Sequence, residues 1–374
     1  MSKPSKRTTV ADIARACGVS TATVSRVLSG NKRNQPIAEE TRDRVLAAAE
    51  KMGHMPSRLP QLLKQGKTGL INFSLPSPDV WNPAWMTHVY DYQPILSFLG
   101  GCSMILLTAL EERHRDIDAV FHFRRAGKLF DPLDFKMDMV DGMVYSSPAP
   151  SESSTYMDIV KRGFPIVFDT LLTDHPEFYC VGGDNEATVQ IAVQYLIRLG
   201  CRNIRLVVPE SHEIPINAQR IRAYNKAMMS AGIKPLECLD FTYKMHQEQP
   251  GQIASSILNH GEQRPDGLIF GDTITAYRFV SDSPSLGVRI PDDLSVLCLG
   301  DRIECQMCNP SLTALYQPTA LVFSEALDML TDIIKGTPPA IRHRIIEPAF
   351  SVRGSCGGSQ SVADQILSAP QPQG

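Results

Sequence analysis

Apolar positions near the start of the chain recur at helical spacing in three short segments. In the first segment, Val10, Ile13 and Ala14 fall at positions i, i+3 and i+4 after a capping-box variant that begins at Thr9. The third segment, residues 39–52, has acidic residues in its first turn and a lysine near its end, as the helix dipole favours. Its expected inward positions are Val45, Leu46, Ala49 and Met52. The spacing predicts a small bundle of three helices.

The second helical segment follows a turn at Gly18, a residue type that tolerates the left-handed backbone of a sharp turn. Ser20 is placed to cap the helix by accepting a hydrogen bond from a backbone amide in its first turn. Val24, Val27 and Leu28 then line one side at helical spacing. The other side carries small and polar side chains and one arginine: Thr21, Ala22, Ser25 and Arg26.

From residue 69 onward, short apolar runs alternate with helical patterns. Alternation over roughly 280 residues predicts parallel sheets flanked by helices, and the length suits two doubly wound α/β lobes better than one. The runs expected to form strands are residues 69–75, 103–109, 141–146, 165–168, 204–208, 266–270 and 294–299. Helical patterns are clearest at residues 185–200 and 218–232.

The stretch HMPSRLPQLLKQGKTG lies between the three helical segments and the α/β region. Its two prolines and its glycine-containing C-terminal end are typical of a linker between domains. The sequence therefore predicts a helical domain at residues 1–56, a linker at 57–67 and an α/β domain at 68–354. Residues 355–374 are polar and rich in proline and glutamine, and we expect a disordered tail there.

The net charge of −3 is unevenly distributed along the chain. Residues 1–66 carry 12 Lys and Arg against 5 Asp and Glu, whereas the remainder carries 25 against 35. A compact basic segment on an acidic body suggests an appended polyanion-binding domain. Nine scattered cysteines fit reduced thiols in a cytoplasm, and no apolar run is long enough for a membrane span or a secretion signal.

A helix, a glycine-containing turn, a second helix and then a third form the helix-turn-helix pattern. A helix that reads DNA must expose short side chains so that its backbone can approach base edges, and Thr21, Ala22 and Ser25 satisfy this need. Arg26 can donate two hydrogen bonds to the O6 and N7 atoms of guanine. On the pattern alone, an ordinary surface helix of a small bundle remains an alternative.

The segment TTVADIARACGVSTATVSRVLSG closely resembles the N-terminal signature of the LacI/GalR family of bacterial transcription regulators. The resemblance implies an all-α helix-turn-helix domain with a hinge helix, then a periplasmic-binding-protein-like domain of two doubly wound parallel-sheet lobes. It continues to about residue 355 through EETRDRVLAAAEKMGHMPSRLPQLLKQGKTGLI, NPAW (82–85), GDNEATVQIAVQYLIRLGCRNIRLV (183–207), RIRAYNKAM (220–228), RIPDDLSVLCLGD (289–301) and NPSLTALYQP (309–318).

The same resemblance implies which residues contact DNA. In the linker it implies a hinge helix that enters the minor groove, where Leu63 wedges into a base step. Ser57 would cap this helix and Arg58 would lie near a phosphate. Pro60 replaces the usual alanine, a change that a first helical turn tolerates, and Ala38 replaces the usual capping serine or threonine before the third helix. On the recognition helix, the implied contacts are Thr21, Ala22, Thr23, Ser25 and Arg26.

For the larger domain, the resemblance implies a small-molecule effector, such as a carbohydrate or a related metabolite, bound at the carboxyl ends of the strands. Arg220 matches the family's ligand-contacting arginine, and a bidentate guanidinium suits vicinal hydroxyls or a carboxylate. Gly300 stands where an aspartate commonly binds ligand, with Asp301 one residue later, and this departure weakens the case for a sugar. The expected effector contacts are Trp85, Arg220, Phe241, Asp272 and Asp301.

No metal site, cofactor or catalytic constellation is predicted. Cys305 and Cys308 form a single CxxC pair with no second pair, which favours a chance pairing over a zinc or redox site.

Taken together, the motifs and the resemblance predict a cytoplasmic homodimer that binds a pseudopalindromic operator in double-stranded DNA, as a repressor with an effector. The alternatives are an activator, a regulator with a non-sugar effector, a carbohydrate-binding protein whose N-terminal segment only positions it, and an enzyme built on the lobes.

Overall fold

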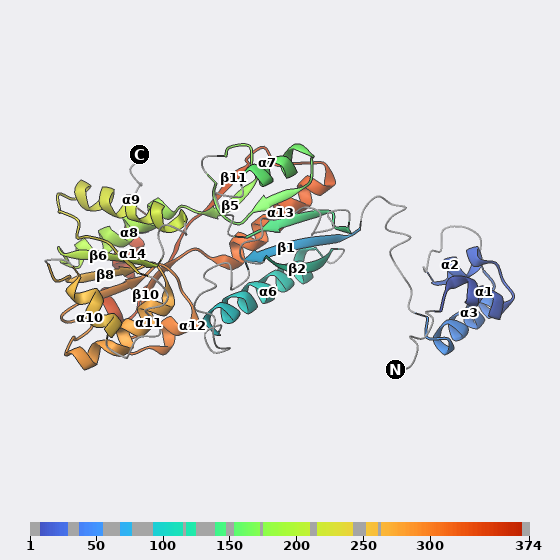
Figure 1. The fold of residues 1–374 in the computed structure, drawn as a ribbon, viewed down its shortest axis with the longest axis horizontal. Coiled ribbons are helices and arrows are strands. Elements are labelled where there is room, and N and C mark those ends of the chain that lie inside the picture. Colours follow the sequence, from blue (N-terminus) through green and yellow to red (C-terminus); the bar gives the residue numbers. More distant parts are fainter. Residues whose placement is uncertain are drawn as a thin grey trace. The chain divides into compact units, whose positions relative to one another are not determined.

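The chain divides into two compact units, Met1–Thr68 and Gly69–Gly374, in a computed structural model (Figure 1). The structure describes residues 8–28, 37–54, 68–76, 93–114, 117–124, 139–146, 153–172, 175–209, 215–241, 252–260 and 263–368. Within those ranges, no helix combines the length and the apolar character needed to cross a membrane.

The described part of the first unit is a bundle of three helices, as the spacing predicted: α1 (Val10–Cys17), α2 (Thr21–Leu28) and α3 (Glu39–Lys51). Thr9 caps α1 in a complete capping box, in which the Asp12 carboxylate accepts from the Thr9 amide at 3.0 Å. Ala38 gives α3 no side-chain cap, as expected. Seven buried side chains form the core: Ile13, Ala14, Cys17, Val24, Val27, Val45 and Ala49.

One predicted core position of this bundle is wrong. Leu46 is 43% exposed, whereas its neighbour Val45 is fully buried. Consecutive residues of an α-helix lie about 100° apart around its axis, so the residue after Val45 turns away from α1 and α2. The buried stripe of α3 instead runs through Val45 and Ala49, with Ala48 and Met52 packed at its side.

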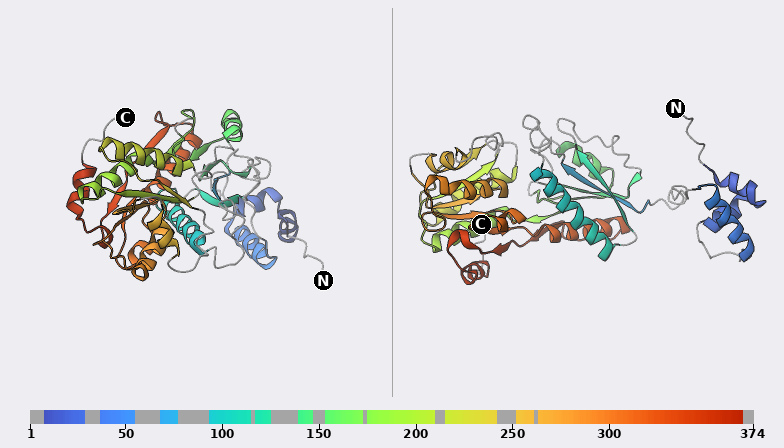
Figure 2. Two further views of the ribbon diagram at one scale, coloured as in Figure 1. Left: turned by 60° about the vertical axis from the view of Figure 1, so that its left-hand side comes forward. Right: turned by 90° about the horizontal axis from the view of Figure 1, so that it is seen from below.

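The first lobe of the second unit is a parallel six-stranded sheet with strand order β11-β5-β4-β3-β1-β2. Helices α6 (Gln93–Arg113) and α13 (Thr319–Lys335) pack together on one face, and Figure 2 shows the two running side by side. Helix α7 (Ser153–Lys161) packs on the opposite face. The strands are β1 (Leu70–Pro76), β2 (Asp118–Arg124), β3 (Gly142–Tyr145), β4 (Ile166–Phe168), β5 (Cys180–Gly183) and β11 (His343–Ile346).

The apolar run at residues 103–109, predicted as a strand, lies inside helix α6, so that prediction is wrong. A short apolar run does not distinguish a strand from a helix, and this one continues an unbroken helix of 21 residues. The second strand of the lobe is β2, within the stretch HRDIDAVFHFRR. Its alternating exposure, with Val120 42% exposed, reflects its position at the edge of the sheet.

The second lobe repeats this plan with strand order β12-β10-β9-β8-β6-β7, and all its strand pairs are parallel except β10 with β12. Helices α8 (Asn185–Arg198) and α9 (Pro215–Ser230) pack on one face of the sheet. Helices α10 (Gln252–Asn259), α11 (Thr273–Asp282) and α12 (Ile303–Met307) pack on the other. The strands are β6 (Ile204–Pro209), β7 (Leu239–Phe241), β8 (Gly267–Phe270), β9 (Ser295–Cys298), β10 (Thr313–Tyr316) and β12 (Ala349–Ser351).

The expected disordered tail is wrong for residues 355–368. A short 3-10 helix (Gly354–Cys356) leads into α14 (Gln360–Leu367), whose Ala363 and Ile366 are almost fully buried. These side chains join the apolar core shared by α8 and α9, with Val362 and Leu367 packed against it. The polar composition concealed this amphipathic helix, because only every third or fourth residue needs to be apolar for one face to be buried.

The two lobes are joined by three crossings of the chain. Strand β5 ends at Gly183 and α8 begins at Asn185 in the other lobe. Strand β10 ends at Tyr316 and α13 begins at Thr319, and a third crossing runs from β11 to β12. Because all three crossings leave from the carboxyl ends of strands (β5, β10 and β11), the carboxyl edges of the two sheets adjoin the crossings.

Candidate nucleic-acid interface and effector site

Helix α2 buries one side and exposes the other, in the manner that the sequence predicted. Val24 and Val27 are buried, whereas Thr21, Ala22 and Ser25 are exposed. Thr23 and Arg26 are of intermediate exposure. The exposed side therefore consists of small side chains that allow another molecule to approach the helix backbone closely.

The start of α2 is fixed by a cap and a turn. The Ser20 hydroxyl accepts from the backbone amide of Thr23 at 3.1 Å, as expected for the capping residue. Gly18 has a φ of 63° in the left-handed region, and its amide bonds to the carbonyl of Ala14 at the end of α1. These contacts set the angle at which α2 leaves α1.

A further contact, which the sequence did not indicate, joins the two ends of the bundle. The hydroxyl of Thr8 donates to the carbonyl of Met52 at 2.7 Å, and Nδ1 of His54 bonds to the carbonyl of Thr8 at 2.8 Å. The start of α1 is thereby tied to the residues that follow α3. The expected hinge residues Ser57, Arg58 and Leu63 lie outside the described residues.

In the second lobe, Arg220 and Asp272 lie close together beside the end of β8. The Arg220 guanidinium donates to the carbonyl of Gly271 at 2.8 Å and to Oδ1 of Asn217 at 3.2 Å. Asp272 caps α11, because its Oδ1 accepts from the backbone amide of Thr275 at 2.9 Å. Its other carboxylate oxygen is buried and has no hydrogen-bond partner in the described part of the chain.

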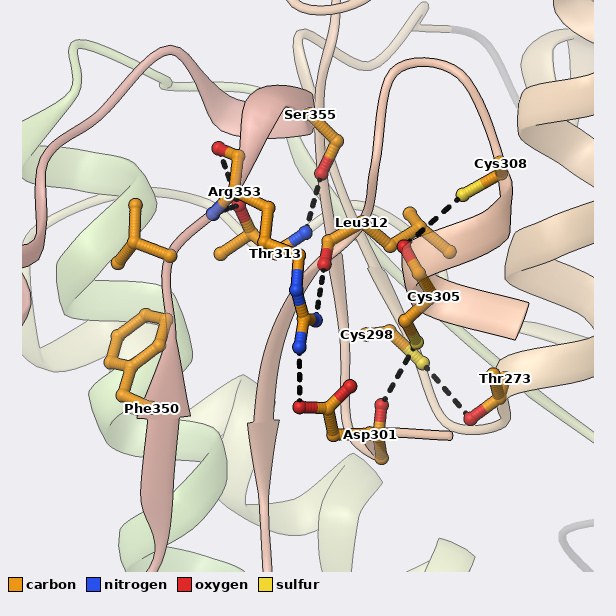
Figure 3. Close-up of polar contacts among 12 residues, drawn as sticks. Thr273, Cys298, Asp301, Cys305, Cys308, Leu312, Thr313, Phe350, Arg353 and Ser355 are labelled. Carbon is orange, nitrogen blue, oxygen red and sulfur yellow. Dashed lines mark hydrogen bonds and ion pairs between the residues drawn. The ribbon is translucent and has the colours of Figure 1, made fainter. Parts of the chain in front are cut away.

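Asp301 follows the neighbouring strand β9 and is paired with an arginine from the C-terminal part of the lobe (Figure 3). Its Oδ2 accepts from the Arg353 guanidinium at 2.7 Å, and the side chains are only 10% and 17% exposed. Burial acts to lower the pKa of Arg353, but the hydrogen bond to Asp301 and its negative charge raise that pKa overall. Oδ1 of Asp301 is buried without a hydrogen-bond partner among the described residues.

The structure thus places four of the five expected effector residues at the carboxyl edge of the second sheet. Strands β8 and β9 are paired, with Phe270 opposite Cys298, so the loops bearing Asp272 and Asp301 are adjacent. Trp85 lies outside the described residues, and Phe241 is the last residue of β7, at the same carboxyl edge. Both aspartates hold structural contacts that the sequence alone did not reveal.

A chain of side-chain amides connects this edge to the crossings between the lobes. Gln317 donates to Oδ1 of Asn185 at 3.2 Å, and Asn185 donates to Oε1 of Gln219 at 3.4 Å. Gln219 precedes Arg220 on α9. The helix that carries an expected effector residue is therefore also hydrogen-bonded, through Asn185 and Gln317, to two of the chain crossings between the lobes. Sequence reasoning missed this network because neutral amides have no motif.

No group of three or more His, Cys, Asp or Glu side chains in the described ranges has a geometry that could hold a metal ion. Cys305 and Cys308 are both buried, and the Cys308 thiol donates to the Cys305 carbonyl at 3.5 Å. The described geometry of this CxxC pair therefore gives no support to a metal centre.

Comparison with known families matches both units. Residues 9–57 match the model of bacterial regulatory proteins of the lacI family, and residues 193–356 match that of a periplasmic binding protein-like domain. Catabolite control protein A of Priestia megaterium is 25% identical over 328 residues, which cover 86% of this chain and 91% of that protein.

Two solved structures share the fold along most of the chain. A lac repressor dimer bound to operator and the anti-inducer ONPF matches with a TM-score of 0.73 and 18% identity, covering 94% of this chain and 99% of that one. A complex of the transcriptional regulator CelR with cellobiose matches with a TM-score of 0.62 and 22% identity, covering 93% and 100%. The helical unit and the two α/β lobes therefore occur together, in the same order, in other proteins.

Proposed function

Because this chain belongs to the lacI family of bacterial regulatory proteins, we propose that it is a transcriptional repressor that binds a specific DNA operator and responds to a small-molecule effector. The DNA-binding role is supported by one observation above the others. Helix α2 carries a face of small exposed side chains, held by the Gly18 turn and the Ser20 cap, within the segment that matches the family model. Neither a carbohydrate-binding protein nor an enzyme needs such a face.

We assign direct base readout chiefly to Arg26. The side chains of Thr21 and Ala22 offer few hydrogen bonds, so their role is to admit the helix into the major groove and to contact apolar base edges. Thr23 and Ser25 are proposed to contact the DNA backbone, which fixes position without reading sequence. On the family resemblance, Leu63 is proposed to wedge into a base step from the minor groove, Ser57 to cap the hinge helix and Arg58 to lie near a phosphate.

We propose that the protein acts as a homodimer on a pseudopalindromic operator. On α6, Met104 is 64% exposed and Leu107 is 42% exposed, and Val120 of the neighbouring edge strand is 42% exposed. A surface hollow of about 430 Å³ beside them includes Leu110 and Ile117. Such apolar surface suits a second copy of the chain, and a two-fold dimer pairs naturally with two operator half-sites.

The effector is proposed to bind at the carboxyl edge of the lobes, with Arg220, Asp272, Asp301 and Phe241 near it; Trp85 is a further expected contact that lies outside the described residues. Asp272 and Asp301 each carry one carboxylate oxygen without a hydrogen-bond partner in the described ranges, and a ligand with hydroxyl or amine donors would satisfy both. The cellobiose complex of CelR supports a carbohydrate. Gly300 and the Asp301–Arg353 pair favour the second candidate, a non-sugar effector, because the carboxylate there is already neutralised.

The test is operator selection from a random DNA library by the full chain, followed by binding at several salt concentrations. The proposal requires an enriched pseudopalindrome, an affinity at least 1000-fold above that for random DNA, roughly the lower limit for specific DNA-binding proteins, and a steep loss of affinity with salt. Sugars and other metabolites are then screened by thermal shift with and without operator. A compound that changes operator affinity must have its own affinity changed by operator to the same factor. Binding of a sugar with no DNA preference would instead support the carbohydrate-binding rival.

A further inference from the structure

Three thiols meet at the carboxyl end of β9, under the short helix α12 (Figure 3). Cys298 ends the strand, and Cys305 and Cys308 come from α12 and the residue that follows it. The Cys298 and Cys305 side chains point toward each other, and their sulfur atoms lie side by side (Figure 3). Cys308 points elsewhere, because its thiol donates to a backbone carbonyl. The contacting thiols are therefore Cys298 and Cys305, which are not the pair of the CxxC motif.

The environments of these two thiols differ in a way that suits an attacking and a resolving cysteine. The side-chain contact with Cys298 lowers the pKa of Cys305, burial opposes this, and the net direction is downward, with help from the backbone at Arg302 and the charge of Arg353. The contact with Cys305 and complete burial raise the pKa of Cys298. Cys305 is thus the thiol of the pair that loses its proton more readily.

We propose that Cys298 and Cys305 form a reversible intramolecular disulfide when the protein meets a peroxide. The Cys305 thiolate attacks one peroxide oxygen; an S–O bond forms, the O–O bond breaks, and hydroxide leaves. The Cys298 sulfur then attacks the sulfenic acid, an S–S bond forms, and the S–O bond breaks. With the thiol protons the two oxygens leave as two waters, and two thiols are oxidised by two electrons.

The position of this pair links the disulfide to the loop between β9 and α12. In the reduced state, the Cys305 thiol donates to the carbonyl of Gly300 at 3.4 Å and the Cys298 thiol donates to Oγ1 of Thr273 at 3.7 Å. Oxidation removes both S–H donors and closes a covalent ring around Gly300 and Asp301. The inference goes beyond the proposed function and does not depend on it, because it concerns the chemistry of these two sulfurs alone.

Access to Cys305 comes from the surface side. The residue is fully buried, but the helix that carries it has only five residues, and the side chains of Ile303 and Met307 at its two ends are 57% and 70% exposed. Brief local opening of one short surface helix exposes the sulfur without unfolding the lobe. Cys180 and Cys356, whose pKa values burial raises to about 12, provide an internal comparison because thiols in that state react slowly.

The experiment is peptide mapping of the reduced full-length protein after brief exposure to hydrogen peroxide and alkylation under denaturing conditions. Trypsin cuts after Arg289, Arg302 and Lys335, so Cys298 lies in peptide 290–302 and Cys305 in peptide 303–335. The expected product is a cross-link between these two peptides, with the loss of two alkylatable thiols per chain and full recovery with dithiothreitol. A bond between Cys305 and Cys308 would stay within one peptide and would overturn the assignment.

Two variants identify the sulfurs. Cys308→Ser is expected to leave the cross-link intact, because Cys308 donates to a carbonyl and not to the pair. Cys298→Ser is expected to abolish it and to leave Cys305 as a stable sulfenic acid, which dimedone captures. Thermal melts confirm that both variants are folded. A cross-link that is lost in Cys308→Ser, or wild-type thiols at 298 and 305 that remain alkylatable at peroxide doses that oxidise Cys238, would overturn the proposal.

Discussion

The carboxylate of Asp301 accepts a hydrogen bond from the guanidinium of Arg353 at 2.7 Å, with both side chains more than four-fifths buried. The pair joins the loop after β9 to the segment after β12, which are 52 residues apart in sequence. Arg353 also donates to the carbonyl of Leu312 at 2.8 Å. The effector edge of the second lobe is therefore fastened to the C-terminal part of the chain.

Breaking this pair is expected to destabilise the second unit strongly. Asp301→Asn leaves a buried guanidinium without its counter-charge, which typically costs about 3–5 kcal/mol in free energy of unfolding. Urea titration of the full chain, followed by tyrosine fluorescence, measures the loss. The control is Arg289→Gln, which breaks a pair whose side chains are 71% and 36% exposed and whose loss should change the free energy of unfolding far less, because water screens exposed charges. Equal losses in the two variants would contradict a special role for the buried pair.

That exposed control pair makes its own prediction about pH. The side-chain hydrogen bond from Arg289, and then the one from its backbone amide, lower the pKa of Asp293 to about 2 from an ordinary value of 3.8. Because the folded pKa lies below the unfolded one, the stabilisation is complete above about pH 4 and disappears as the pH falls toward 2. Carboxyl carbon NMR should place the Asp293 titration near pH 2 in the wild type and at a higher pH in Arg289→Gln, where only the hydrogen bond from the backbone amide remains. A titration near 4 in the wild type would show that the contact is absent in solution.

The helical spacing of the N-terminal unit was sufficient to predict its three helices, and the segments at residues 69–75, 141–146 and 204–208 were recognised as strands because each is short and bounded by turn residues. The prediction of a strand at 103–109 was wrong because Met104 and Leu107 are apolar residues on the exposed face of a helix. An amphipathic helix is recognised by a polar face opposite its apolar face, and this helix has no such polar face along the run. The same face is the one that we propose to be covered by a second copy.

The candidate site could be predicted only where residue type matched a motif. Arg220, Asp272 and Asp301 do reach one edge of the sheet, but the partners of the first and last could not be predicted, because Gly271 and Arg353 are brought to them by tertiary packing. The cap formed by Asp272 is a local contact with Thr275, whereas the ion pair of Asp301 at 2.7 Å joins residues 52 positions apart, which no local spacing encodes. The pairing of Cys298 with Cys305, rather than of Cys305 with Cys308, has the same origin.

Substitution of Gly18 should weaken the bundle through its backbone alone. A Cβ at this position would meet no atom within 4 Å, so no steric clash contributes, but the φ of 63° is unfavourable for other residue types. Gly18→Ala is expected to cost about 1–2 kcal/mol, and Gly18→Asn less, because asparagine adopts the left-handed region more readily. Amide exchange of α1 and α2 in the full chain measures both. Equal effects of Ala and Asn would point away from backbone strain.

Arg26→Ala should relax operator selectivity more than it reduces general DNA affinity. A bidentate arginine–guanine contact contributes about 1–3 kcal/mol of discrimination, so the ratio of operator to random-DNA affinity should fall roughly 5- to 150-fold. Arg15→Ala is the matched control, because Arg15 lies on α1 with its side chain 79% exposed and outside the proposed reading face. Fluorescence anisotropy on the selected operator and a scrambled duplex gives the ratio. An unchanged ratio in Arg26→Ala would remove Arg26 from base readout.

Leu63→Ala tests the proposed hinge wedge. An apolar wedge unstacks one base step and permits a bend, so its loss should reduce both operator affinity and DNA bending. Circular-permutation gel shifts report the bend angle and anisotropy reports the affinity. Retention of both would exclude the wedge, even if Arg26→Ala still relaxed selectivity.

A double-mutant cycle can establish whether Gly183 and Gln317 affect stability through the same hydrogen bond, the one from Gln317 to Asn185. A Cβ at Gly183 would clash with the end of the Gln317 side chain, so Gly183→Ala must push that side chain off Asn185, which is itself buried. Gln317→Ala removes the same hydrogen bond directly. Each single variant should cost about 1–2 kcal/mol, because the Asn185 carbonyl is left without its donor. If the two residues act only through that bond, the double variant costs no more than either single one, giving a coupling energy of about 1–2 kcal/mol. Additive losses in urea titration would mean that the clash at Gly183 is relieved elsewhere and that Gln317 stabilises the crossing by another contact.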